Sequence, residues 1–392
     1  MSKVCSIFSQ MLQLISRTAF DAAVRKHRAE RHARGFSSWG QFVAMLFCQL
    51  GGAKSLREIC GGLAASEGKL RHLGLPQAPP RSTLAYANEH RPWSLYEDVF
   101  HHVLGECRAV AAHPFKGRRK FRFKHKLLSL DATLIDLCAS VFDWARFRRT
   151  KGAVKLHLLL DHDGFLPCYA VITEGKQHEV GVARQWSYEP GTLLVMDRGY
   201  NDYTWFADLT RQGVYFVTRL KDNADYIVVE DRELPHRKGL LRDQVICFYQ
   251  QARDGQECYF RRIEFYDEEQ DRVLVFVTNH LTLAAATVAE VYKQRWQIEL
   301  FFKALKQSLR IKTFVGTSAN ALKTQIWAAL IAILLIKYLQ LKATFGWSLS
   351  NLVALLRQQL FVYRDLWVWI DQPFQAPEPS PILPQQLAMT WR

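Results

Sequence analysis

One segment of the chain combines a single carboxylate with cations and a phenol at helical spacing. The segment reads YKQRWQIELFFKALK over residues 292–306, inside a helix expected over 287–309. Each helical residue advances by about 100°, so polar side chains gather on one arc and apolar ones on the next. The polar arc holds Tyr292, Arg295, Glu299 and Lys306, with Lys303 and Arg310 beside it.

An ordinary solvent-exposed helix face would show the same spacing. Arg295–Glu299 and Glu299–Lys303 are pairs of opposite charge at a separation that allows ion pairs on a helix surface. The other interpretation is a catalytic carboxylate among groups that bind phosphate. The helix alone does not decide between the two, so the decision depends on the rest of the chain.

Two further carboxylates accompany apolar runs typical of buried strands, one within its run and one directly after it. Asp131 stands in LLSLDATLID and Asp197 in LLVMDRGY. Three carboxylates in a basic protein suit two-metal phosphoryl transfer, in which two ions about 3.5–4 Å apart activate the attacking oxygen and stabilise the leaving one. We expect two Mg²⁺ ions, for which Mn²⁺ can substitute, with Asp131 as the bridging ligand and Asp197 and Glu299 as the outer ligands.

Other side chains of the ligand type fit a structural role or stand apart from these motifs. Asp161 and Asp163 suit a turn between two expected strands, and His157 lies within a strand pattern. Asp136 and Asp143 are further candidate ligands.

The three motifs together resemble those of DDE transposases of the insertion-sequence-four family. The helix matches the signature Tyr-x2-Arg-x3-Glu-x6-Lys, with Trp296 after the arginine, and the motifs run in the right order from about residue 127 to 310. The resemblance implies a cut-and-paste transposase that binds the terminal inverted repeats of its insertion sequence. It implies a nick at the transposon end, a hairpin intermediate, strand transfer into target DNA, and a homodimer that holds paired ends in a synaptic complex.

The resemblance also assigns roles around the carboxylates. Tyr292, Arg295 and Lys306 would grip phosphates beside the cut, although Tyr292 could be a core-edge aromatic and Lys306 a solvent lysine. Trp296 would pack against the second DNA strand or buttress the helix, and we favour the buttress. Other expected DNA contacts are Arg198 and Tyr200 of the DRGY motif, Lys303 and Arg310.

Composition favours a polyanionic partner such as double-stranded DNA. The chain has 392 residues, with 52 Lys or Arg against 37 Asp or Glu and a net charge of +15. A generic basic protein would share this excess. The eight cysteines show no C-x-x-C pair and no zinc-ligand spacing, so we expect reduced thiols in a cytoplasmic protein.

No segment is predicted to enter a membrane. The N-terminus lacks an apolar run of secretory length, and the longest apolar run, Ile326–Ile336, is too short for a bilayer span. That run suits a buried core helix. We therefore expect a cytoplasmic protein that associates with the bacterial nucleoid and binds no membrane.

Apolar periodicity gives the first part of the chain a helical organisation. Residues 1–112 are expected to form a DNA-binding domain of helix-turn-helix type, with a supporting helical bundle as the alternative. Residues 113–126 are a basic linker in which Phe121 and Phe123 could pack or stack, or a solvated segment. The cations near the short helices are Arg57, Lys69, Arg71 and Arg81.

The next part, residues 127–220, shows three strands, a helix, a strand, a helix and a strand. That order is the ribonuclease H-like arrangement, in which the first and fourth strands are neighbours, so Asp131 and Asp197 would lie side by side. The expected fold class is α/β. The remaining parts are an all-β insertion over 221–280, the second part of the core over 281–316, and C-terminal helices over 317–392.

Three other functions share parts of this pattern. A ribonuclease H-like nuclease would hydrolyse DNA without strand transfer, and a catalytically inactive relative would only bind DNA. A basic nucleoid protein would bind DNA independently of the three carboxylates. The β-rich insertion and the helix with Tyr, Arg and Lys favour the transposase.

Overall fold

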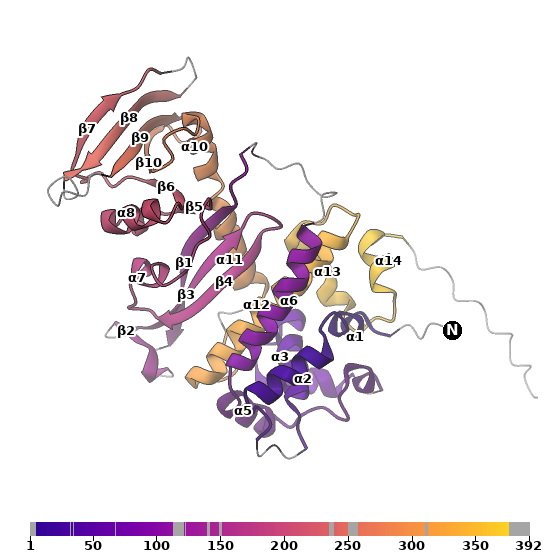
Figure 1. Ribbon diagram of the computed structural model, residues 1–392. Helices are drawn as coiled ribbons and strands as arrows, with labels where there is room; N and C mark the ends of the chain where they lie inside the picture. Colours follow the sequence, from indigo (N-terminus) through magenta and orange to yellow (C-terminus); the bar gives the residue numbers. More distant parts are fainter. Residues whose placement is uncertain are drawn as a thin grey trace, which may run out of the picture.

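A ten-stranded sheet is the frame of the described chain, which covers residues 5–31, 33, 35–66, 68–112, 121, 123–138, 142–148, 151–234, 239–249, 258–309 and 313–375 of the computed structural model (Figure 1). The strand order is β2-β3-β1-β5-β6-β10-β9-β8-β7, and β4 also pairs with β3. The strands are β1 Leu127–Cys138, β2 Arg146–Arg148, β3 Lys151–Asp161, β4 Leu166–Glu174, β5 Leu193–Met196, β6 Tyr215–Arg219, β7 Tyr226–Asp231, β8 Leu240–Phe248, β9 Tyr259–Asp267 and β10 Arg272–Thr278.

Helices precede the sheet, connect its strands and follow it. The N-terminal helices are α1 Ile7–Leu12, α2 Arg17–Lys26, α3 Ser38–Gly51, α4 Leu56–Ala64, η1 Leu70–Leu73, α5 Arg81–His90 and α6 Ser94–Ala111. The helices between strands are η2 Asp143–Ala145, α7 Glu179–Ala183, η3 Arg198–Tyr200 and α8 Tyr203–Arg211. The last helices are α10 Ala285–Lys293, α11 Trp296–Ser308, α12 Ala319–Lys342, α13 Leu349–Gln359 and α14 Leu366–Asp371.

The most apolar strands lie in the middle of the sheet. All four residues of β5 are buried, as are the first four of β1, which is typical of strands covered on both faces. The two strands pair in parallel from Leu127 with Leu193 to Leu130 with Met196. This confirms that the first and the fourth of the predicted strands are neighbours.

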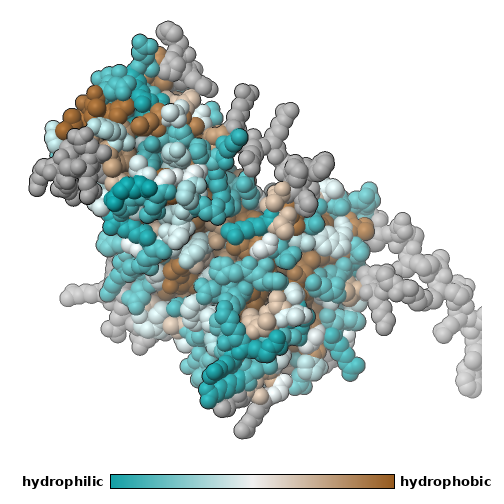
Figure 2. All heavy atoms as spheres, viewed as in Figure 1, coloured by the Kyte–Doolittle hydropathy of each residue, from teal (hydrophilic) through white to brown (hydrophobic). Residues whose placement is uncertain are grey.

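The β-rich segment extends the same sheet. β10 pairs antiparallel with β6, and β9, β8 and β7 follow in antiparallel order. The strands expected within residues 221–280 are therefore present, joined to the core by main-chain hydrogen bonds. The last strand, β7, carries the exposed apolar side chains Ile227, Val228 and Val229, and Figure 2 shows apolar surface over this end of the sheet.

The two faces of the central strands are covered by different helices. On one face Leu128 and Leu130 pack with Val182 of α7 and Phe206 of α8. Side chains alternate along a strand, so the odd-numbered residues of β1 face the other way. On that face Leu127 packs with α10, and further along β1 lies the core formed by the N-terminal and C-terminal helices.

The N-terminal and C-terminal helices share one apolar core. Trp327 of α12 is fully buried, and its ring lies 5.1 Å from that of Phe100 in α6. The thiol of Cys107 in α6 donates to the backbone oxygen of Leu334 in α12 at 3.4 Å. The boundary predicted at residue 112 therefore does not coincide with a boundary between cores in the described residues.

Helix α12 corrects one argument made from the sequence. The run Ile326–Ile336 is short, but the whole helix has 24 residues and a window of mean hydropathy 1.6, enough by length and composition to cross a membrane. In this structure 83% of that window is buried inside the protein. Burial against neighbouring helices, and not insufficient length, identifies α12 as a core helix.

Only part of the predicted basic linker lies within the described residues. Residues 113–120 and 122 lie outside them, as do Arg310 and most of the Pro-rich tail. Phe121 and Phe123 stack on one another at 4.9 Å and pack against the core that contains α10. Their rings therefore pack against the protein core, which is one of the two roles expected for them.

The shared core generates a prediction about truncation. Removal of residues 1–112 exposes the apolar sides of α12 that α3, α5 and α6 cover, so we expect the remaining chain to aggregate and to bind a dye for exposed apolar surface. Size-exclusion chromatography and dye fluorescence test this against the full chain. A monomeric truncated protein with near-UV circular dichroism of a packed core would contradict it.

Candidate active site

Asp131 and Asp197 lie side by side at the edge where the pairing of β1 with β5 ends. Their parallel strands, β1 and β5, end their pairing at Leu130 and Met196, and each aspartate is the next residue. Asp197 directly follows the carboxyl end of β5, a common place for ligands and catalysis. Asp131 lies beside it within β1, which continues to Cys138. The structure therefore brings together these two predicted site residues.

The Asp131 carboxylate is largely buried. Its side chain is 18% exposed, and its Oδ1 accepts a hydrogen bond from the backbone of Ala132 at 2.8 Å. Burial raises the pKa of Asp131 to about 7, because burial penalises the charged form. The Ala132 bond and Arg295 act in the opposite direction, while Asp197 and Glu179 add to the rise.

Glu299 reaches this edge from α11, through Arg295. Nη2 of Arg295 lies 2.5 Å from Oε1 of Glu299, and Nη1 lies 3.8 Å from Oδ2 of Asp131. One guanidinium therefore bridges the first and third carboxylates of the predicted triad. Glu299 is one-third exposed, which leaves its carboxylate accessible to a ligand.

The predicted single helix over 287–309 is wrong. A turn at Gln294 and Arg295 separates α10 from α11, with backbone bonds between residues three apart, such as Ile298 to Arg295 at 3.2 Å. The two helices serve different cores: Val288 of α10 packs with the central strands, and Ile298 of α11 packs with the helical core. The turn lets the apolar residues of α10 and of α11 face these different cores, and it directs the Arg295 side chain toward Asp131.

Tyr292 belongs mostly to the protein interior. It is 8% exposed, and its ring lies 5.1 Å from that of Phe276 in β10. Burial raises the pKa of its hydroxyl. The guanidinium carbon of Arg295 lies 5.7 Å from the ring centre, within the range of a cation–π contact. These contacts favour the core-edge interpretation.

Some of the remaining predicted phosphate contacts are exposed, and others already form contacts within the protein. Lys303 is exposed on α11, and the half-exposed Arg198 forms a long ion pair of 4.0 Å with Asp222. Nζ of Lys306 donates to the backbone oxygen of Leu134 in β1 at 2.7 Å. Lys306 therefore ties α11 to the strand that carries Asp131.

Two of the predicted roles are wrong. Tyr200 was expected to contact DNA, but its side chain is fully buried because η3 turns it into the core under α7 and α8. Trp296 was expected to buttress the helix, but it is 55% exposed at the first position of α11. Its exposure keeps it available as a DNA contact, whereas Tyr200 is not available.

Two charged residues near the site were missed. Arg219 ends β6, is paired with Phe276 and lies within electrostatic range of Tyr292. Its position two residues after Val217 on a predicted strand was the available signal. Glu179 begins α7 and lies within electrostatic range of Asp131. The sequence gives it no comparable signal.

Two other ligand-type side chains, those of Asp161 and His157, have structural partners. Oδ1 of Asp161 accepts from the backbone of Asp163 at 2.9 Å, as a turn requires. The ring of His157 is buried and lies 2.9 Å from the hydroxyl of Thr173. These interpretations from the sequence are confirmed. Asp136 is exposed on β1.

The carboxylates fit a divalent cation in their chemistry, although in the described residues no three acidic, His or Cys side chains converge at ligand distance. All three offer hard oxygen donors. A cation already lies between two of them, because the Arg295 guanidinium contacts both Asp131 and Glu299. Occupation by a metal therefore requires these side chains to rearrange.

Comparison with known proteins gives a family match over the centre of the chain. Residues 122–335, more than half of the chain, match the model described as the transposase DDE domain. This span contains Asp131, Asp197 and Glu299. Residues 4–76 match a model described as a domain of unknown function (DUF4372).

Three curated relatives are similar over most of their length. A candidate transposase of Sinorhizobium fredii is 28% identical over 314 residues, covering 79% of this chain and 85% of that protein. A candidate transposase for an insertion sequence element of Geobacillus stearothermophilus is 28% identical, covering 69% and 70%. One from Synechocystis is 24% identical, covering 58% and 64%.

Among solved structures, the piggyBac transposase synaptic complex with hairpin DNA, determined by cryo-EM, aligns with 98% of this chain and 85% of that chain. The TM-score is 0.45 and the sequence identity 10%. A similarity of this size supports no inference about the chain.

The raised pKa of Asp131 predicts how its substitution changes stability with pH. Burial of the Asp131 charge does not change the stability of the folded, metal-free protein below pH 3.8, the ordinary pKa of an aspartate. The loss of stability grows between pH 3.8 and about 7 and is complete above pH 7. Asp131→Asn removes this cost, so we expect the melting temperature in EDTA to rise at pH 8 and to rise less at pH 5. Calorimetry at both pH values measures it, with exposed Asp136→Asn as the control. An equal shift at both pH values would contradict it.

Proposed function

This chain belongs to the transposase DDE domain family, and we propose that Asp131, Asp197 and Glu299 are the catalytic carboxylates of this transposase. Membership confirms the family predicted from the three motifs. Members of the family cut DNA and transfer strands. The observation that carries the site assignment is the meeting of two carboxylates on adjacent parallel strands with a third that Arg295 holds beside them.

The catalytic core is proposed to be ribonuclease H-like. The strand order β4-β3-β1-β5-β6, with β3 antiparallel to β1 and with β5 and β6 parallel, supports this proposal. Under it β7 to β10 are an all-β insertion between β6 and the helix that carries Glu299. The N-terminal helices and α12 to α14 then lie outside the catalytic core in sequence, although they share its packing.

The family uses divalent metal ions, and we propose that the ions are Mg²⁺, two per site, with Mn²⁺ as a substitute. Asp131 would hold both ions, and Asp197 and Glu299 would each hold one. When bound, the ions supply activation of the attacking oxygen and stabilisation of the leaving one. The buried position of Asp131 supports its role as the shared ligand, since a buried charge needs a nearby cation.

Arg295 is proposed to exchange its carboxylate partners for a phosphate of the DNA. Its Nε is buried and makes no hydrogen bond to a described residue, so it offers a donor that a phosphate oxygen could use. A guanidinium fork matches phosphate geometry. The exposed Lys303, Arg198 and Trp296 lie near enough in sequence to the site elements to contact the flanking DNA.

The DNA chemistry follows from the family and from the resemblance to the insertion-sequence-four transposases. In the proposed sequence, water attacks a phosphodiester at the transposon end and leaves a free 3′-hydroxyl. That hydroxyl attacks the opposite strand and forms a hairpin, which is opened before transfer into the target. The terminal inverted repeats and the target DNA are the proposed partners, bound by a homodimer in a synaptic complex, at the nucleoid in the cytoplasm.

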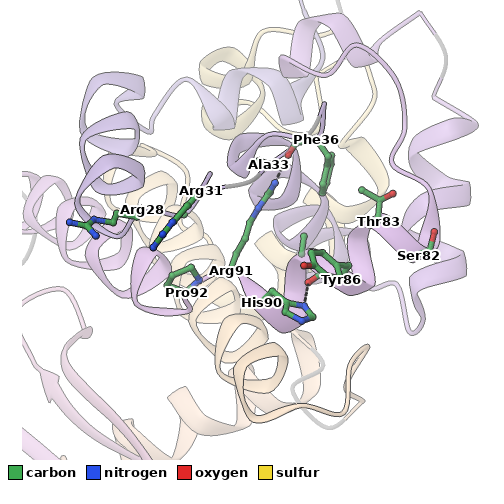
Figure 3. A pocket seen from close by; sticks show the side chains of 12 residues that line it. Arg28, Arg31, Ala33, Phe36, Ser82, Thr83, Tyr86, His90, Arg91 and Pro92 are labelled. Carbon is green, nitrogen blue, oxygen red and sulfur yellow. Dashed lines mark hydrogen bonds between the residues drawn. The ribbon is translucent and has the colours of Figure 1, made fainter.

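The N-terminal helices are proposed to bind the DNA ends, and one open pocket supports this. Its volume is about 730 Å³, and it lies beside α5 (Figure 3). The described residues that line it include Arg28, Arg31 and Arg91 and no acidic residue. An anionic ligand complements such walls.

An aromatic pair forms one side of this pocket. The rings of Tyr86 and His90 stack at 4.0 Å, and Tyr86 is 65% exposed (Figure 3). Arg91 is engaged, because it donates to the backbone oxygens of Phe36 and Ser37. Arg28 and Arg31 are exposed, so they are the cations that we assign to phosphate binding.

The proposed catalytic residues predict a separation of cutting from binding. Asp131→Ala, Asp197→Ala and Glu299→Ala should each abolish Mg²⁺-dependent cleavage of a labelled duplex that carries a terminal repeat. Binding of the same duplex should change little, because phosphate affinity comes mainly from cations. Denaturing gels resolve nicks, hairpins and joined products.

The exposed Asp136→Ala on the same strand is the matched control and should cut like the wild type. Robust cutting by the Asp197→Ala variant would refute the site assignment. Nicks without hairpins or joined products from the wild type would favour a nuclease over the hairpin route.

The pocket predicts a salt-dependent decrease in DNA affinity. Substitution of Arg28 and Arg31 by Ala should weaken binding to the terminal repeat and reduce the slope of log affinity against log salt by about 1 for each phosphate that the variant no longer neutralises. Fluorescence anisotropy at several salt concentrations measures both. Arg184→Ala and Arg211→Ala, which remove arginines paired with aspartates elsewhere, are the controls. An unchanged salt slope would contradict the assignment.

A further inference from the structure

A fourth carboxylate approaches the pair Asp131 and Asp197 from the opposite face of the sheet to Glu299. Glu179 is the first residue of α7, which packs on the face that carries Leu128 and Leu130. Its Oε2 lies 3.7 Å, and Oδ1 of Asp197 lies 3.8 Å, from the point where a Cβ on Gly199 would be. The two carboxylates therefore border the same small volume.

One oxygen of Glu179 is fixed by a lysine. Nζ of Lys155 in β3 lies 3.2 Å from Oε1 of Glu179 and donates to the backbone oxygen of Gln177 at 2.9 Å. The Lys155 side chain is 12% exposed, so this contact is more ordered than a surface ion pair. It could serve only to attach α7 to the sheet, but that role leaves the direction of Oε2 unexplained.

A buried hydroxyl gives the second and independent observation. Tyr200 is 0% exposed, and its hydroxyl makes no hydrogen bond to any residue in the described part of the chain. The carboxylates within its electrostatic range are those of Asp131, Glu179 and Asp197. A buried hydroxyl without a hydrogen-bond partner destabilises the fold, so we expect a group that completes this site to accept a hydrogen bond from the Tyr200 hydroxyl.

The charges around this edge leave room for a cation. Four carboxylates, from Asp131, Glu179, Asp197 and Glu299, surround the edge, and the cations Arg295 and Lys155 contact three of them. When Arg295 moves to a phosphate, negative charge remains on the carboxylates. A divalent cation neutralises such a group at lower cost than protonation of its members would at neutral pH.

We propose that Glu179 and Tyr200 are positioning residues of the cation site. Glu179 is a fourth carboxylate that strengthens cation binding beside Asp197. The Tyr200 hydroxyl donates a hydrogen bond to the site once the cation is bound. This proposal rests on the proposed metal-dependent function of Asp131, Asp197 and Glu299. Lys155 keeps Oε1 of Glu179 away from the site and leaves Oε2 directed toward it.

Direct binding of Mn²⁺ to the full chain tests the proposal without the cutting reaction. Electron paramagnetic resonance reports the free ion as it is titrated with wild-type protein, Glu179→Gln, Tyr200→Phe and Asp197→Ala. We expect Glu179→Gln to weaken the affinity about 10–100-fold, the range for groups that support metal ligands, and Tyr200→Phe to weaken it by a smaller factor. Glu174→Gln, an exposed glutamate at the end of β4, should bind like the wild type.

The variants separate this inference from the proposed function. If Asp197→Ala binds Mn²⁺ as tightly as the wild type, the metal site itself is wrongly assigned. If Asp197→Ala abolishes binding while both Glu179→Gln and Tyr200→Phe keep wild-type affinity, only the positioning role is overturned. If Glu179→Gln fails to fold, as judged by circular dichroism, the nearly isosteric Tyr200→Phe variant decides by the same comparison.

Discussion

The ion contacts of Arg295 hold the active-site edge together. Carboxylates at the ends of neighbouring strands repel one another, and burial of Asp131 raises its pKa to about 7, so its charge needs a cation nearby. Two unit charges 4 Å apart interact by about 4 kcal/mol at an effective dielectric constant of 20, so one well-placed guanidinium offsets a repulsion of that size. Arg295 contacts Asp131 and Glu299 at once, which links a helix to a strand through charge.

That contact depends on the break between α10 and α11. A continuous helix would carry one apolar stripe, but the chain must cover the central strands with Val288 and then enter the helical core with Ile298. The turn at Arg295 connects the two helices and places the guanidinium between the two cores. Lys306 fixes the far part of α11 to the backbone of β1. The position of Glu299 is therefore set by packing on both sides of the turn.

The sequence predicts the carboxylates well and their surroundings less well. Asp131 lies within one buried strand and Asp197 directly follows another, and the element order predicts that these strands are neighbours. The helical spacing places Arg295 next to Glu299. The break between α10 and α11 has no Gly or Pro to announce it, because tertiary packing causes it. Tyr200 was expected to be exposed and is buried, and Trp296 was expected to pack and is exposed. The reason is similar, because a local turn, and not residue type, decides which aromatic is buried. The position of Glu179 depends on a contact between helix α7 and Lys155 of β3, which sequence spacing cannot reveal.

A crystal structure of the protein with a terminal-repeat duplex and Mn²⁺, with anomalous scattering used to locate the ions, tests the central claim most directly. The expected result is a Mn²⁺ peak in contact with the carboxylates of Asp131 and Asp197, with the guanidinium of Arg295 on a DNA phosphate. Mn²⁺ peaks away from these carboxylates, with Arg295 still joined to Asp131 and Glu299 in a complex that cuts DNA, would contradict it.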